Sequence, residues 1–128
     1  MSYYFSRTFD LSFEEAEKKV TEELQRHGFG ILTHIDVQAT LKKKLDVDFR
    51  RYHILGTCNP PFAHRALQAE RMIGLMLPCN VVVQERADGK IEVAAIDPVA
   101  SMQAVQNPKL KEVAREVQHL LKRVVENL

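Results

Sequence analysis

The stretch CNVVVQERADGKIEVAAID at residues 79–97 contains the strongest local folding signal in the chain. Two valine-containing runs, 79–86 and 91–97, lie on either side of the tetrapeptide ADGK at 87–90. An Asp-Gly pair between two such runs is typical of a β-hairpin. The sequence therefore predicts two paired, antiparallel strands at this point.

Upstream of the hairpin, the pattern of apolar residues predicts three strands and three helices. Alternation of apolar and polar side chains, with Tyr3, Phe5 and Phe9 on one side, is typical of a half-buried strand. Ser12 and Glu15 form a capping box, which marks the start of a helix. The predicted strands cover residues 3–9, 29–36 and 50–58, and the predicted helices cover 12–27, 37–45 and 61–73.

Two of these helices carry more detailed expectations. Pro61 suits a first helical position, whereas Pro60 precedes another proline and is expected to lie outside the helix. In the short lysine-rich helix, the spacing predicts that Val37, Leu41 and Leu45 face inward. The first expectation concerns where the helix at 61–73 begins, and the second concerns which side of the helix at 37–45 is buried.

Downstream of the hairpin, Asn107 and Pro108 supply an N-cap and a first helical residue. They predict a helix over 108–127, whose broad apolar stripe is typical of a helix that packs on a large surface. The order of the elements favours an α+β fold with an antiparallel component. No linker or repeat interrupts this order, so residues 1–128 are expected to form a single domain.

The composition argues against several classes of protein. The 128 residues include 18 Lys plus Arg and 17 Asp plus Glu, a formal net charge of +1 that disfavours phosphate-driven nucleic-acid binding. No apolar run approaches the length needed to cross a bilayer, about 20 residues. A signal peptide and the glycine motifs of nucleotide binding are both missing, and two cysteines are too few for a secreted disulfide scaffold. We therefore expect a cytoplasmic protein with no cofactor, no nucleic-acid partner and no membrane association.

The stretch TCNPPFAHR at 57–65 holds the densest group of chemically capable side chains. Cys58 lies just before the predicted helix, and His64 lies one turn inside it. Free amides at a helix start stabilise a thiolate, phosphate or carboxylate, to which His64 and Arg65 add donors. In the structural alternative, Cys58 is a small buried residue and Asn59 a turn residue, with both basic side chains in solvent.

A second thiol, Cys79, lies in the sequence LPCN at 77–80, which is similar to the motif around Cys58. Two strand ends could thus bring the two thiols together. A zinc site would also need two histidines from scattered positions, and the chain has no close Cys or His doublet. The two histidines would have to come from the three candidates His34, His53 and His64. We therefore predict no metal site.

Three further groups have both a chemical and a structural interpretation. His34 and His53 lie on predicted strands, where either could act as a general base, although a satisfied strand histidine is commoner. Asp97, which precedes Pro98, could place a carboxylate at the rim of a cleft, although Asp-Pro also starts turns. The basic cluster within 42–51 contains acidic residues and is interpreted as a solvated surface.

Three runs of residues together resemble a known family: ILGTCNPPFAHRAL at 54–67, IGLMLPCNVVV at 73–83, and the Asp-Pro pair at 97–98. They are similar to the domain of unknown function 302 family of bacteria and archaea, over essentially the whole chain. The motif positions in this sequence are Cys58, Asn59, Pro60, Ala63, His64, Pro78, Cys79, Asp97 and Pro98.

The resemblance implies a fold similar to the TATA-binding-protein group. That fold has a curved, mainly antiparallel sheet of about five strands with the two main helices, 12–27 and 108–127, on one face. The short helices near 37–45 and 61–73 are then insertions between strands. The resemblance also implies a homodimer, and it implies no particular activity.

Two classes of function are consistent with these observations. The first is a non-enzymatic binding module for a small molecule, anions included, that acts as a homodimer. The alternative is a thiol-dependent enzyme or redox protein that uses Cys58 and His64 as catalytic residues. A structural or protein-interaction subunit is a further alternative. The predicted ligand-binding residues are Cys58, Asn59, His64, Arg65, Cys79 and Asp97.

Overall fold

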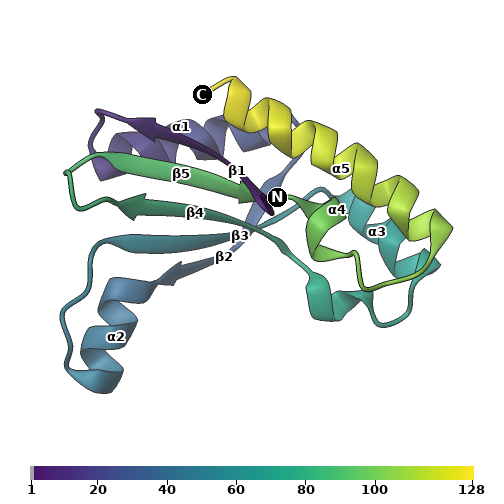
Figure 1. Ribbon diagram of the computed structural model, residues 1–128, viewed down its shortest axis with the longest axis horizontal. Coiled ribbons are helices and arrows are strands. Elements are labelled where there is room, and N and C mark those ends of the chain that lie inside the picture. Colours follow the sequence, from purple (N-terminus) through teal and green to yellow (C-terminus); the bar gives the residue numbers. More distant parts are fainter. Residues whose placement is uncertain (1) are drawn as a thin grey trace.

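The computed structural model describes residues 2–128, which contain five strands (Figure 1). The strands are Tyr4–Phe9 (β1), Gly30–Asp36 (β2), Tyr52–Cys58 (β3), Cys79–Glu85 (β4) and Ile91–Ile96 (β5). They form one antiparallel sheet in the order β1, β5, β4, β3, β2. The predicted hairpin is the pair β4 and β5, and Gly89 in its turn has a φ of +82°. The expected α+β fold is confirmed.

Two long helices, α1 at Phe13–Arg26 and α5 at Pro108–Glu126, cover one face of the sheet (Figure 1). The capping box of α1 is present: the Ser12 side chain accepts from the Glu15 amide, and the Ser12 amide donates to the Glu15 carboxylate. At α5 the Asn107 side chain accepts from two amides of the first turn. Among the described residues, no helix is both long and apolar enough to span a bilayer.

The hydrophobic core lies between these helices and the sheet. Val20 of α1, Leu121 of α5 and Val83 of β4 are fully buried there. Burying a side chain of this size contributes about 1.5–3 kcal/mol, so the apolar stripes of the helices hold this layer together. Because neighbouring strand residues point to opposite faces, Val82 lies on the side of the sheet that α1 and α5 leave uncovered.

A short helix, α2 at Val37–Leu45, lies where it was expected, with Asp36 as its N-cap. The expectation that Leu45 faces inward is wrong, because its side chain is 65% exposed. The helix projects from the edge of the sheet at β2 and β3 and does not lie on the sheet (Figure 1). No residue of α2 is buried.

The helix predicted over 61–73 is shorter in the structure, where α3 covers Pro60–Ala69, and a separate 3₁₀ turn, η1, follows at Ile73–Met76. Pro60 belongs to α3, contrary to expectation, because the first residues of a helix need no intrahelical N–H partner. The helix ends early because Glu70 has an extended backbone, with φ −142° and ψ 111°. One further short helix, α4 at Pro98–Ser101, was not predicted.

Candidate functional site

A cavity of about 320 Å³ lies between α3, α5 and the adjoining ends of β3 and β4. Leu32 and Leu67 line it and are themselves 65% and 47% exposed, so the cavity opens to solvent beside them. Its walls are predominantly apolar, which suits a ligand with little charge. They include Phe29, Phe62, Ala66, Met102, Val113 and Val117.

Both cysteines, Cys58 and Cys79, are free thiols in the lining of this cavity. The pairing of β3 with β4 brings them near each other, because Thr57 lies opposite Cys79 and donates its hydroxyl to the Cys79 carbonyl oxygen at 2.9 Å. Burial, and to a smaller extent the neighbouring Cys58, raises the pKa of the Cys79 thiol to about 11. Cys79 is therefore protonated at neutral pH and acts as part of the apolar wall.

Asn59 also lines the cavity, and its side-chain amide helps to hold the fold. The Nδ2 group donates to the His27 carbonyl oxygen at 3.1 Å, which ties the start of α3 to the end of α1. Gly28, next to His27, has a φ of +86°, and a Cβ there would lie 3.1 Å from Asn59 Nδ2. Within residues 2–128 no hydrogen bond is donated to Asn59 Oδ1, so this oxygen is the acceptor that Asn59 can offer to a ligand.

The other predicted ligand-binding residues lie outside the cavity lining. His64 is exposed, and Arg65 forms an ion pair with Glu116 of α5 at 2.8 Å. Asp97 is the N-cap of α4 and accepts from the Gln118 side chain at 3.1 Å with each carboxylate oxygen. The cavity thus brings together Cys58, Asn59 and Cys79.

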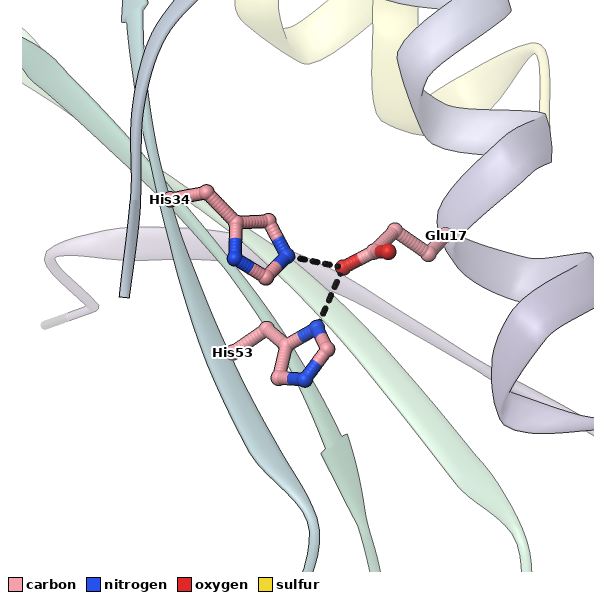
Figure 2. Close-up of side chains that lie close together, drawn as sticks. All are labelled: Glu17, His34 and His53. Carbon is pink, nitrogen blue, oxygen red and sulfur yellow. Dashed lines mark hydrogen bonds and ion pairs between the residues drawn. The ribbon is translucent and has the colours of Figure 1, made fainter. Parts of the chain in front are cut away.

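A second group of polar side chains lies between α1 and the strands β2 and β3 (Figure 2). Glu17 Oε1 is 2.6 Å from His53 Nδ1 and 3.3 Å from His34 Nε2. The His53 ring also packs edge-on against Phe13, with ring centroids 4.7 Å apart. Within residues 2–128, this is the one group of at least three Cys, His or acidic residues whose donor atoms lie close enough to hold a metal ion.

The register of β2 against β3 explains why the two histidines meet. His34 pairs with Leu55 and Asp36 pairs with His53, so all four side chains lie on the helix-facing side of the sheet with the buried Leu55. Asp36 Oδ1 accepts from the Ala39 amide and caps α2, while Oδ2 lies 3.6 Å from His53 Nε2. Asp36 therefore faces the ring nitrogen of His53 that Glu17 does not contact.

The sequence singles out His34 and His53 as separate candidates, and the structure brings them together with Glu17. Glu17 has no sequence signal of its own beyond its position four residues after Phe13, beside the apolar stripe of α1. The mixed cysteine and histidine zinc set considered from the sequence is not assembled among the described residues. The cysteines line the cavity, and these two histidines lie in the second group.

Comparison with known proteins identifies relatives of the whole chain. Residues 5–128 match the family described as "Domain of unknown function DUF302". A similar solved structure is the "Crystal structure of uncharacterized conserved protein DUF302 from Bacillus stearothermophilus", with 27% sequence identity and a TM-score of 0.90. That alignment covers 98% of each chain. No curated protein matches the chain.

Proposed function

The chain belongs to the DUF302 family, as its motifs predicted, and from its cavity we propose that it is a non-enzymatic binding module for a small, neutral, largely apolar molecule. The observation that carries the proposal is the cavity of about 320 Å³, open to solvent beside Leu32 and Leu67. Ligand pockets span about 300–1,000 Å³ and combine apolar walls with a few polar groups. Here the polar groups are the Asn59 side-chain amide and the Thr57 hydroxyl, which donates to the Cys79 carbonyl oxygen.

The start of α3 favours a neutral ligand over an anion. Pro60 and Pro61 occupy the first two helical positions and have no N–H to donate. The Ala63 amide already donates to the Asn59 carbonyl oxygen at 3.0 Å. This leaves Phe62 with the free amide of the first turn, which is a weak basis for binding a phosphate or carboxylate.

A titration with N-phenylnaphthylamine, a neutral aromatic fluorophore, tests the proposal. We expect its emission to rise in the apolar cavity and to saturate at one probe per chain. Ala63→Phe adds a ring to the cavity wall and should weaken binding by at least about tenfold, because the ring fills the space that the probe needs. Anilinonaphthalenesulfonate, which adds a sulfonate to the same skeleton, should bind more weakly.

Ala39→Phe is the matched control, since Ala39 is exposed on α2 and lies outside the cavity lining. Its affinity for the probe should equal that of the native chain. Equal affinities in the two phenylalanine variants, with native circular dichroism spectra, would reject the cavity as the binding site. Tighter binding of the sulfonated probe would favour an anion as the ligand.

The thiol-dependent alternative has less support. His64, its predicted base, is exposed and outside the cavity lining, whereas Cys58 lies within it. The second thiol, Cys79, is held in its protonated form by burial. An activated thiolate needs a base or a cationic neighbour, and the cavity lining contains neither.

We also propose that the module is a homodimer that buries the uncovered face of the sheet. Val82 of β4 pairs with Ala94 of β5 on this face, and Tyr4 and Tyr52 lie near them. Sedimentation measurements should give the mass of two chains. Val82→Arg should reduce that mass to one chain, because it places a charge in the buried surface. A single-chain mass for the native protein at all concentrations would contradict the dimer.

A further inference from the structure

We propose that Glu17, His34 and His53 form a binding site for a divalent metal ion such as Zn²⁺, separate from the apolar cavity. One carboxylate oxygen faces two imidazole nitrogens, and the three donor atoms lie within 4.8 Å of one another (Figure 2). Imidazole nitrogen and carboxylate oxygen are both zinc ligands in proteins. Three protein ligands leave a fourth position for water, as in open zinc sites.

The spacing of the donors is close to that of a tetrahedral site. Zinc bonds of about 2.0–2.1 Å separate two ligand atoms by about 3.4 Å. The distance from Glu17 Oε1 to His34 Nε2 is already 3.3 Å. The distance from Oε1 to His53 Nδ1 is 2.6 Å and needs to open by less than about 1 Å, which a change in the Glu17 side-chain torsions can supply.

The charges around the two imidazoles favour a cation at this point. Glu17 lies beside one ring nitrogen of His53 and Asp36 beside the other, so two carboxylates flank an imidazole that is neutral when unprotonated. A bound dication balances both carboxylates. If His53 directs its Nε2–H toward Asp36, its Nδ1 lone pair points toward Glu17 and the proposed ion. Asp36 then acts as a positioning residue, since carboxylates commonly orient metal-bound histidines.

The two histidine side chains combine a rigid ligand with an accessible one. The His53 side chain is 12% exposed, and the His34 side chain is 47% exposed. Their ring centroids are 4.4 Å apart and the rings lie edge to face on two paired strands, so the two imidazole donors are held by the sheet and not by a loop. The exposed side of His34 gives an ion and its water ligand a route to the site.

Titration of the metal-free protein with Zn²⁺ by calorimetry, and with Co²⁺ by visible absorption, tests this site. We expect one ion per chain and the strong Co²⁺ absorption bands of four-coordinate geometry. Glu17→Gln, His34→Ala and His53→Ala should each weaken Zn²⁺ binding by at least about tenfold, because the first replaces a charged ligand with a neutral one and the other two remove a ligand. Asp36→Asn keeps an oxygen for the α2 cap and should weaken binding by about tenfold, because it disturbs the orientation of His53.

His119→Ala is the matched control, since His119 is exposed on α5 and outside the group. It should bind Zn²⁺ as the native chain does. Absence of binding to the native chain, or an affinity unchanged in both His34→Ala and His53→Ala, would overturn the proposal. Native circular dichroism spectra show that a loss is not due to unfolding. N-phenylnaphthylamine binding should persist in these variants, so failure of the metal site and failure of the cavity are separately visible.

Discussion

The apolar cavity and the histidine group lie on the same side of one sheet, at opposite ends of β3, and they differ in chemistry. The strand directs His53, Leu55 and Thr57 to its helix-facing side. His53 joins the histidine group, Leu55 is buried in the core, and Thr57 lines the cavity. The cavity end is covered by α3 and α5, whereas the other end lies beside the sheet edge under α1. The comparison teaches that one face of β3 supplies residues to both regions, and that the neighbouring elements, α3 and α5 at one end and β2 and α1 at the other, decide what surrounds those residues.

The largest effect is expected from Leu55→Ala, which changes the residue between the two regions. Leu55 is 1% exposed, so truncation leaves a void and should lower the free energy of unfolding by about 2–5 kcal/mol. Chemical denaturation measures this change. Leu75→Ala is the control, because Leu75 is 78% exposed and its loss should cost no more than about 0.5 kcal/mol. Equal losses at the two leucines would contradict the central position of Leu55.

An intermediate effect, confined to one region, is expected from Asn59→Ala. The His27 carbonyl oxygen loses its donor, which should cost about 1–3 kcal/mol of stability in denaturation. Probe binding in the cavity should weaken because the start of α3 is no longer tied to α1, while Zn²⁺ affinity should not change. Asn80→Ala, at an exposed position, is the control and should alter neither site. A parallel loss at both sites would show that the two regions are coupled.

The smallest effect concerns the pH dependence of the cavity wall. Cys79 is the remaining thiol in a Cys58→Ser variant, and burial, the larger cause of its raised pKa, persists there. Alkylation by iodoacetamide should therefore stay slow at pH 8 and accelerate only toward pH 11. A rate that reaches half its maximum near the ordinary thiol pKa, about 8.5, would show that Cys79 is solvated.

The raised pKa of Cys79 also determines how the free energy of unfolding changes with pH. The pKa of Cys79 in the folded chain, about 11, lies above the unfolded value of about 8.5. The protonated thiol therefore stabilises the fold below pH 8.5 or so, and this contribution is lost as the pH rises toward 11. Replacing Cys79 with Ala should remove this alkaline loss of stability in denaturation experiments.

Turns and helix starts that depend on residues close by in the sequence could be predicted from the sequence. The turn at Gly89 and the capping box at Ser12 depend on residues only a few positions away, and both are present. The end of α3 depends on a distant contact, since the Asn107 side chain donates to the Ala69 carbonyl oxygen at 2.8 Å and to Glu70 at 3.1 Å. A contact spanning about 38 residues leaves no local signal, which is why the predicted helix was too long.

Of the two candidate sites, one has a local signal in the sequence and the other depends on distant contacts. The two thiols could be related to each other because their local motifs are similar and each lies at one end of a strand, Cys58 as the last residue of β3 and Cys79 as the first residue of β4. The group of Glu17, His34 and His53 depends on the register of β2 against β3 and on which side of α1 faces that edge. The apolar stripe of α1 indicates which side of the helix packs on the sheet, but neither the register of β2 against β3 nor the strands that this side meets follow from one sequence. His34 and His53 could therefore be named singly, and their association with Glu17 could not.

The central claim, that the cavity beneath α3 and α5 binds a neutral apolar molecule, is tested most directly by nuclear magnetic resonance. N-phenylnaphthylamine is added to the isotope-labelled chain, and the backbone amides that shift are mapped. We expect the shifts to concentrate at 57–67, on β3 and α3, and at 113–117 on α5. Shifts confined to α2, or to Val82 and Ala94 on the uncovered face of the sheet, would contradict the claim.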